Sequence, residues 1–170
     1  LERYPLSAAS SGAAMGPPTV GWVGQRSTSN FLKPLLPIFQ ELIDAEHAQV
    51  CAVGIDAKAL GFTMQSVPWS EQTEVADINT FDIGIMPLAD EPFERGKCGY
   101  KLIQYMACGL PVIASPVGLN RDMVEEGVNG FLAETTAEWR HALDRLIADP
   151  ALRQKMGQAG RAMVENRYCL

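Results

Sequence analysis

Two segments of the sequence place glycines, hydroxyl residues and basic side chains where an anion would bind. The first spans residues 21–30, where an apolar run ends at Gly24 and is followed by Gln25, Arg26, Ser27 and Thr28. A strand that turns at a glycine into a helix leaves backbone amides free at the positive end of the helix dipole. These amides and Arg26 would converge on a phosphate or diphosphate group. Because any strand-to-helix turn favours glycine followed by a capping serine or threonine, an ordinary turn is the alternative interpretation.

The second segment spans residues 91–102, between an expected strand at 83–86 and an expected helix that begins near Tyr100. Lys97 and Lys101 would be cations beside a phosphate, and the amides of Gly99 and Tyr100 would point the same way. Open α/β sheets bind ligands in the loops at the carboxyl ends of parallel strands, which is the place expected for this segment. The alternative is a solvated charged loop.

A third segment, Val67, Pro68 and Trp69, ends an expected strand and precedes a stretch rich in acidic residues. An indole ring at the end of a strand can stack on a flat ring of a ligand, but more often it anchors the chain at a half-buried surface. Both interpretations stay open at the level of sequence.

Other catalytic and metal-binding patterns are missing from the sequence. The two histidines, His47 and His141, have no carboxylate or cysteine at a ligand spacing, and there is no nucleophile elbow, zinc-protease helix or P-loop motif. No two cysteines lie at a metal-binding spacing, so we expect no metal site. We expect all four cysteines to be reduced thiols of a cytoplasmic protein: Cys51, Cys98, Cys108 and Cys169.

Composition and charge narrow the class of protein. A chain of 170 residues with 47% hydrophobic and 20% charged residues fits one folded domain with its own core. The net charge of -6 argues against nucleic acid as a partner, because a duplex-binding domain carries a basic excess. Residues 1–18 are rich in small residues and prolines, so we expect a flexible linker or a remnant of an interdomain segment there, and a folded domain over residues 19–170.

Short apolar runs alternate with helical patterns from residue 19 onward. Strands are expected at 19–23, 49–53, 62–67, 83–86 and 112–115. Helices are expected from the first strand to about Ala45 with a bend at Pro37, before Gly109, after a Ser/Thr-x-x-Glu cap at Thr135, and after Asp149. The last helix would bury a stripe formed by Leu152, Met156, Ala159 and Met163. This alternation predicts an α/β fold with helices around a parallel sheet.

Residues 101–114 read K-L-I-Q-Y-M-A-C-G-L-P-V-I-A and resemble the donor-site segment of retaining glycosyltransferases of the GT-B fold, the group 1 or GT4 family. That family's segment has the form K-L-x-E-Y-M-A-x-G-x-P-V-I-A. Val117 and Gly118 resemble the family's next turn, residues 125–132 its E-x-G-x-N-G-F-L hairpin, and residues 20–24 a variant of its opening strand.

The resemblance implies a Rossmann-like three-layer domain, the C-terminal half of a GT-B glycosyltransferase, which binds a nucleotide diphosphate sugar as substrate and needs no cofactor. It implies a hexosyl-type transferase of carbohydrate biosynthesis that retains the configuration of the sugar. The N-terminal acceptor domain would be absent from this chain, which alone would be inactive. The protein would be cytoplasmic, or peripheral to the inner face of a membrane through the absent domain.

The resemblance also implies roles for individual residues. Arg26 and Lys101 would be catalytic because, with the amides of residues 24–28, they would stabilise the leaving nucleoside diphosphate without a metal. The base would be held by backbone near Val67 and Pro68. The implied donor-binding residues are Gly24, Gln25, Ser27, Thr28, Val67, Pro68, Lys97, Gly99, Tyr100 and Gln104.

Two positions depart from the family's pattern. Gln104 stands where the family has the glutamate that binds ribose, and Gly96 stands where the first glutamate of its E-x7-E motif is expected. A carboxylate accepts hydrogen bonds from both ribose hydroxyls, whereas a glutamine amide offers one acceptor and one donor group. The alternative functions are a non-catalytic nucleotide-sugar-binding or scaffold module, and a relative of the sugar-nucleotide epimerases.

Overall fold

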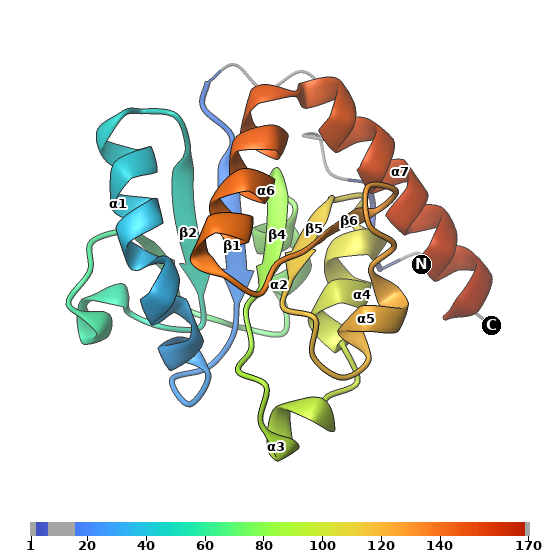
Figure 1. Cartoon of the computed structure of the whole chain (residues 1–170), viewed down its shortest axis with the longest axis horizontal. Coiled ribbons are helices and arrows are strands. Elements are labelled where there is room, and N and C mark those ends of the chain that lie inside the picture. Colours follow the sequence, from blue (N-terminus) through green and yellow to red (C-terminus); the bar gives the residue numbers. More distant parts are fainter. Residues whose placement is uncertain (1–2, 7–15, 169–170) are drawn as a thin grey trace.

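The computed structural model describes residues 3–6 and 16–168; most of the expected linker, residues 7–15, and Cys169 lie outside the described residues. Six strands form one parallel sheet in the order β3-β2-β1-β4-β5-β6 (Figure 1). The strands are β1 (Thr19–Val23), β2 (Gln49–Val53), β3 (Gln65–Val67), β4 (Ile83–Met86), β5 (Val112–Ala114) and β6 (Gly130–Leu132). The strand order reverses between β1 and β4, and open α/β sheets bind ligands outside the carboxyl ends of the strands at such a point.

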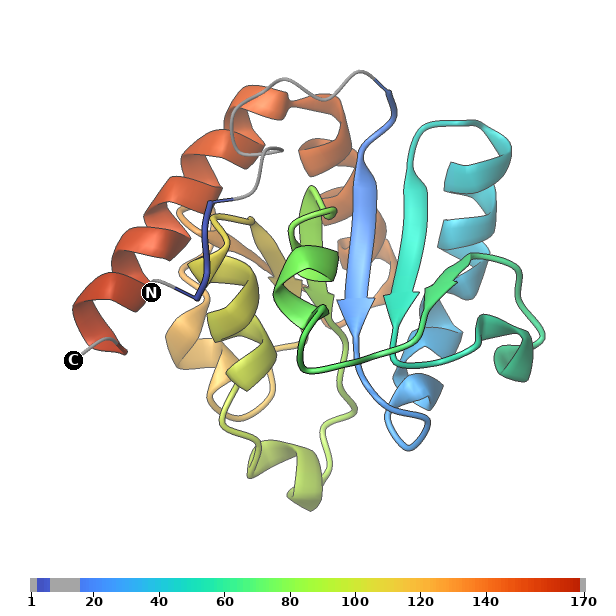
Figure 2. The ribbon, with the colours of Figure 1, turned by 180° about the vertical axis from the view of Figure 1, so that it is seen from behind.

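Helices cover both faces of this sheet, which confirms the expected three-layer α/β architecture. The 3-10 helix η2 (Ser29–Leu35), α1 (Leu36–Asp44) and α6 (Thr136–Ala148) pack on one face (Figure 1). On the other face lie α2 (Glu74–Ile78) and α4 (Tyr100–Ala107), and α7 (Pro150–Arg167) packs against α4 (Figure 2). Three shorter elements are η3 (Ala57–Leu60), α3 (Pro92–Arg95) and α5 (Asn120–Met123).

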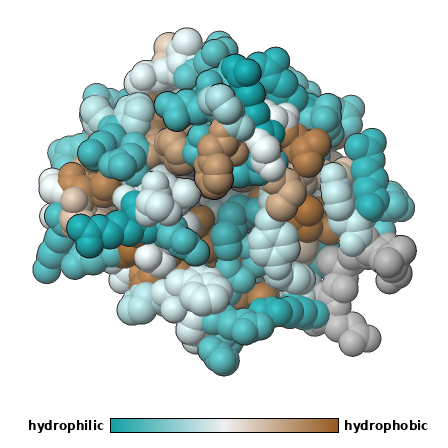
Figure 3. Space-filling model, turned by 90° about the horizontal axis from the view of Figure 1, so that it is seen from below, coloured by the Kyte–Doolittle hydropathy of each residue, from teal (hydrophilic) through white to brown (hydrophobic). Residues whose placement is uncertain are grey.

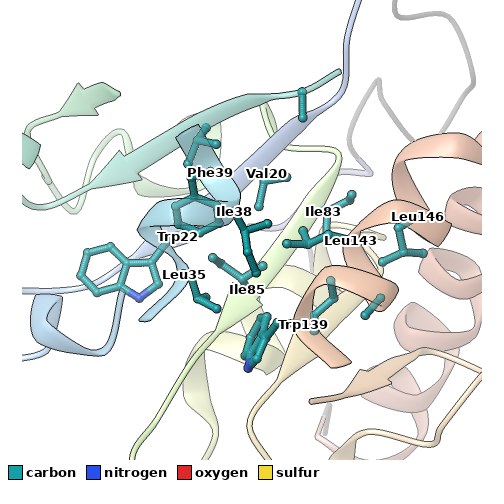
Figure 4. Packing of buried hydrophobic residues seen from close by; sticks show 14 of the residues in the cluster. Val20, Trp22, Leu35, Ile38, Phe39, Ile83, Ile85, Trp139, Leu143 and Leu146 are labelled. Carbon is teal, nitrogen blue, oxygen red and sulfur yellow. The ribbon is translucent and has the colours of Figure 1, made fainter. Parts of the chain in front are cut away.

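The central strand β1 is buried on both sides because alternate residues of a strand point to opposite faces. Val20 and Trp22 belong to the core under α1 and α6, where Phe39 and Trp139 are also buried (Figure 4). Val23 belongs to the core under α4. Apolar residues on both faces of a strand are typical of parallel sheets covered by helices.

Two glycines without side chains on the α4 face of the sheet allow α4 to lie close to the strands. Gly21 of β1 and Gly84 of β4 are register partners. A Cβ added to Gly21 would overlap the ring of Phe81, and one added to Gly84 would lie 2.5 Å from Cγ of Tyr105. The rings of Phe81 and Tyr105 therefore occupy the space that side chains would take at the two glycines, with their centroids 6.4 Å apart.

The strands at 19–23, 49–53 and 83–86 have the expected bounds, whereas β3 begins three residues later than expected, at Gln65, and β5 ends at Ala114. The expected single helix from β1 to Ala45 is wrong. The chain forms η2 and then α1, with Pro37 in the first turn of α1 instead of at a bend in a continuous helix. A proline lacks the amide hydrogen that a helix interior needs, and the first turn leaves that amide unpaired in any case.

The hairpin expected at residues 125–132 is also wrong. Gly130–Leu132 pairs in parallel with β5 and is the sixth strand of the sheet. The residues before it form a turn, in which the amide of Gly127 donates to the carbonyl of Gly130 at 2.9 Å. Glycine and asparagine favour turns of many kinds, so the sequence alone did not show which strand would be the partner.

Helix boundaries that depend on local capping are confirmed. Thr135 and Glu138 form the expected capping box at the start of α6, and the Asp149 carboxylate accepts from the amide of Leu152 at the start of α7. Gly109 ends α4 with a φ of 76°. The buried face of α7 differs from the expected stripe and is formed by Met156, Gly157, Gly160 and Val164, since the two glycines lie against α4 and the turn after it.

Cys51, Cys98 and Cys108 are free thiols, as expected. Burial raises the pKa of the Cys51 thiol to about 11 and that of Cys108 to about 12, so both are protonated at neutral pH. Among the helices that the structure describes, none combines the length and the apolar character needed to cross a bilayer.

We predict that Gly84→Ala destabilises the chain by about 1–3 kcal/mol, because the added methyl group displaces the Tyr105 ring from the sheet. Urea unfolding followed by circular dichroism measures this loss. Gly96→Ala is the matched control, since its φ of -81° suits alanine and its Cβ would make only an ordinary contact, 3.5 Å from the carbonyl oxygen of Phe93. Equal stability of the two variants would show that the glycine pair does not set the position of α4.

Candidate functional site

Among the described residues, two adjoining hollows open at the carboxyl ends of the strands. The larger, of about 880 Å³, lies among the loops that follow β1, β2 and β3. The smaller, of about 420 Å³, lies between the loop after β1 and residues 96–101, which lead into α4. Val23, Gly24, Gln25 and Lys101 line both hollows, so the two meet at these residues. Figure 3 looks onto this edge of the molecule, where hydrophobic and hydrophilic residues lie side by side.

The loop after β1 uses most of its amides for its own structure. The Gly24 amide donates to the Val53 carbonyl at 3.0 Å, and the Gln25 amide donates to the hydroxyl of Thr28 at 3.1 Å. The Thr28 amide in turn donates to the Gln25 carbonyl at 2.9 Å. Of the amides at residues 24–28, which we expected to be free, these three are therefore engaged within the protein.

The start of α4 is better arranged to receive an anion. The Leu102 amide donates to the Gly99 carbonyl at 2.9 Å, but the amides of Tyr100 and Lys101 precede the first intrahelical bonds, and the helix dipole is positive at this end. Lys97 and Lys101 line the smaller hollow beside it. The ammonium group of Lys97 lies 5.1 Å from the ring centroid of Phe31 and 3.7 Å from the Glu94 carboxylate, so its position is set by packing and by charge.

Lys101 belongs to a hydrogen-bonded network that is centred on a buried carboxylate, Glu74 in the first turn of α2. The Lys101 ammonium donates to Glu74 Oε1 at 2.7 Å and to Gln104 Oε1 at 2.9 Å. Glu74 also accepts from Trp69 Nε1 at 2.8 Å and from Gln104 Nε2 at 2.7 Å. An ammonium group has three N–H donors, so two are used inside the network and one can reach a ligand.

The network determines the ionisation of Glu74. Burial favours the neutral acid and raises the pKa, but hydrogen bonds from Lys101, Trp69 and Gln104, together with the charge of Lys101, outweigh it and lower the pKa below its ordinary value. Glu74 is therefore an anion at neutral pH, and it holds Lys101 as a cation at the junction of the two hollows.

Gln104 lies beneath the site rather than on its surface. Its side chain is buried, and both polar groups of its amide are engaged by Lys101 and Glu74. Its Nε2 also lies 3.3 Å from the hydroxyl of Tyr4, in the segment of residues 3–6. Arg161 of α7 donates to the Tyr4 carbonyl at 2.6 Å and so ties that segment to α4 and α7. The pKa of Tyr100 is raised to about 12, first by a hydrogen bond with Tyr4 and second by burial.

The end of β1 is tied to the last turn of α4. The amide of Val23 donates to the Tyr105 hydroxyl at 2.8 Å. Tyr105 is fully buried, and burial raises its pKa well above the ordinary value, so the hydroxyl keeps its proton. This bond and the packing of the ring on Gly84 fix α4 relative to the loop after β1.

The structure places the expected site residues in three groups. One group lines one or both hollows: Gly24, Gln25, Thr28, Pro68, Lys97, Gly99, Tyr100 and Lys101. Arg26 and Ser27 are exposed and lie outside the residues that line these hollows. Val67 is partly buried in the core under α4, where its carbonyl accepts from the Gly54 amide, and Gln104 is buried below Lys101.

Sequence reasoning missed Glu74, Tyr4 and Tyr105 as residues that support the site. In the sequence, Glu74 is one of several acidic residues that follow Trp69. The two residues are five positions apart on an irregular segment, and this spacing does not predict a contact between them. Tyr4 stands 100 residues away from Gln104 in sequence. No group of three or more histidine, cysteine or acidic residues among the described residues is arranged to hold a metal ion.

Comparison with known proteins identifies the family. Residues 17–149 match the family described as glycosyl transferases group 1. The chain belongs to this family. The D-inositol 3-phosphate glycosyltransferase of Pseudarthrobacter chlorophenolicus is 29% identical to it over 133 residues, which are 77% of this group 1 chain and 30% of that protein. Human alpha-1,3/1,6-mannosyltransferase ALG2 is 37% identical over 65 residues, 38% of this chain and 15% of that protein.

Solved structures share the fold of this group 1 chain. The C-terminal domain of the group 1 protein LpcC from Francisella tularensis has a TM-score of 0.73 at 19% identity, covering 97% of this chain and 95% of that domain. HepE from Anabaena, in complex with UDP and glucose, has a TM-score of 0.70 at 19% identity, covering 98% of this chain and 50% of that chain. The fold is that of the C-terminal half of a GT-B glycosyltransferase. The chain spans less than a third of the length of these curated relatives.

We predict that Glu74 contributes stability that is lost at acidic pH. Its folded-state pKa lies below the unfolded value of about 4.3, so the contribution is complete above that value and disappears as the pH falls through the folded pKa. Urea unfolding between pH 7 and pH 3 measures it. The unaltered chain should lose more stability over this range than Glu74→Gln, which cannot titrate at this position. At pH 7 Glu74→Gln should be less stable by about 1–3 kcal/mol, because a neutral amide cannot accept from all three donors.

The exposed carboxylates Asp90 and Glu138 also have lowered pKa values, but they are present in both proteins and cancel in the comparison. Parallel pH profiles of the unaltered chain and Glu74→Gln would contradict the ionisation assigned to Glu74.

Proposed function

We propose that this chain is the donor-binding half of a retaining hexosyltransferase, and that its substrate is a nucleotide diphosphate sugar with no further cofactor. The observation that carries the proposal is the meeting of the two hollows at Lys101, beside the start of α4. The family and the fold support the same function, and the neighbour HepE binds UDP.

The two hollows suit different parts of a nucleotide diphosphate sugar. We place the base and ribose in the larger hollow, which is lined by both apolar and polar side chains and by Pro68 after β3. The diphosphate lies at the start of α4, where backbone amides, Lys97 and the third N–H of Lys101 are donors. The sugar then lies in the smaller hollow, toward the acceptor.

Transfer requires the nucleoside diphosphate to leave with its negative charge. Lys101 and the first amides of α4 stabilise that charge as it develops, and they are held in place before the reaction. Glu74 and Gln104 fix the direction of the Lys101 side chain, so Gln104 acts from below the site in this proposal. Arg26, on the exposed loop after β1, reaches the diphosphate only if its long side chain folds back over Gly24.

The acceptor site belongs in this proposal to an N-terminal domain that the chain does not contain, so the chain binds donor without transferring sugar. The protein works in carbohydrate biosynthesis in the cytoplasm, at the inner face of a membrane where the acceptor requires it. A non-catalytic donor-binding module is the second candidate, and the engagement of Gln104 inside the protein favours it. Both candidates require a nucleotide to bind.

We predict that UDP or GDP raises the melting temperature of the chain by roughly 5–10 °C at 100 times its dissociation constant, from about 2.7 kcal/mol of stabilisation. Differential scanning fluorimetry with UDP, GDP, ADP and NAD measures the shift and names the base. Lys97→Ala and Lys101→Ala should reduce the shift relative to each variant's own melting temperature. Lys33→Ala, on the exposed surface of η2, is the control and should leave it unchanged.

A full shift in Lys101→Ala would remove Lys101 from the proposed diphosphate site. A shift with none of the nucleotides would contradict donor binding by this chain. Arg26→Ala tests the role that the family resemblance implies for Arg26, and a normal shift in that variant would exclude it.

A further inference from the structure

Trp69 differs from the other two tryptophans of the chain. Trp22 and Trp139 are buried in the core, with 5% and 3% of their surface exposed, whereas Trp69 is 52% exposed. It lies on the wall of the larger hollow next to Pro68, at the end of β3. An exposed indole on the wall of a hollow can offer a flat face to a ligand.

The Trp69 ring is fixed from behind. Its Nε1 donates to Glu74 Oε1 at 2.8 Å, and the same oxygen accepts from Lys101 at 2.7 Å. The carboxylate is only 5% exposed, and its second oxygen accepts from Gln104 at 2.7 Å. One buried charge thus holds the indole in the larger hollow and the ammonium group at the junction of the two hollows.

We propose that Trp69 is the stacking wall for the base of the donor, and that Glu74 is the positioning residue that holds the indole in place for stacking. The inference rests on the proposed donor-binding function and adds to it the residue that contacts the base. The indole N–H is used by Glu74, so Trp69 contributes stacking to base binding without a directional hydrogen bond.

The charge of Glu74 is essential to this arrangement. Glutamine at this position would offer one acceptor oxygen to three donors. Its NH₂ group is itself a donor, so it could not accept a hydrogen bond from Lys101 or Gln104. The indole would lose its fixed partner, because charged Lys101 competes more strongly for the remaining oxygen. The same substitution removes the charged partner that holds the Lys101 side chain, so it disturbs anion binding at the start of α4 as well as the indole.

The positioning role can be tested without any ligand. Trp69 is the exposed tryptophan, so quenching of tryptophan fluorescence by acrylamide reports mainly on it, and Trp69→Phe gives the contribution of the other two. We expect Glu74→Gln to raise the quenching constant because the ring is no longer held. Glu71→Gln is the matched control, since Glu71 lies on the same stretch but is paired at the surface with Arg3, and it should leave quenching unchanged.

The stacking role is tested by titrating uridine, guanosine and inorganic pyrophosphate separately into the unaltered chain and the variants, by calorimetry at neutral pH. Trp69→Ala should weaken binding of the preferred nucleoside about tenfold and leave pyrophosphate binding unchanged. Glu74→Gln should weaken the nucleoside several-fold, and it should weaken pyrophosphate too, because Glu74 also holds Lys101. Glu71→Gln should bind both probes like the unaltered chain.

The outcomes separate this inference from the proposed function. Nucleoside binding that survives in Trp69→Ala overturns the stacking wall, and equal quenching in Glu74→Gln and Glu71→Gln overturns the positioning role. Nucleoside binding in Glu74→Gln that equals that of the unaltered chain also overturns the positioning role. If the unaltered chain binds pyrophosphate but not nucleosides, the stacking inference fails while the phosphate site stands. If it binds neither nucleosides, pyrophosphate nor intact nucleotides, the donor function itself fails.

Discussion

The packing of two aromatic rings on two paired glycines is the constraint on which the site depends. Gly21 and Gly84 face each other across β1 and β4, and the rings of Phe81 and Tyr105 fill the space above them. Tyr105 lies in the last turn of α4, so its contact with the sheet sets the distance of that helix from the strands. Its hydroxyl then accepts from the amide at the end of β1. The start of α4 is thereby placed beside the loop after β1, where the two hollows meet.

A second constraint is the buried charge of Glu74. Burying a carboxylate is costly unless donors surround it, and here three side chains from two separate segments supply them. Lys101 and Gln104 come from α4 and Trp69 from the end of β3. These contacts give the site a defined geometry without a bound ligand. They also place the negative charge of this network next to Lys101, which lines both hollows and has one N–H that the network does not use.

Much of the fold was predictable because it depends on local signals. Alternating apolar runs and helical periods predicted the parallel sheet, and three strands had the expected bounds. The capping box at Thr135 and the cap at Asp149 are formed by neighbours in sequence, so they could be read directly. Errors arose where a choice depended on distant partners. The β6 strand needs β5 to be recognised as a strand, and the buried face of α7 is set by the glycines that let it approach α4.

The sequence by itself determined the family, the α/β class and the positions of Lys97, Lys101 and Pro68 near the carboxyl ends of the strands, because motif spacing and strand order are local properties of the chain. Only the tertiary structure decided which groups act on those residues. In the folded chain, amides of the loop after β1 donate to acceptors of the protein itself. Gln104 is buried below Lys101, and Glu74 contacts both Gln104 and Lys101. These outcomes depend on contacts between segments that are far apart in sequence, such as Tyr4 and Gln104, which are separated by 100 residues. Packing of helices on the sheet creates such contacts, and no spacing in the sequence encodes them.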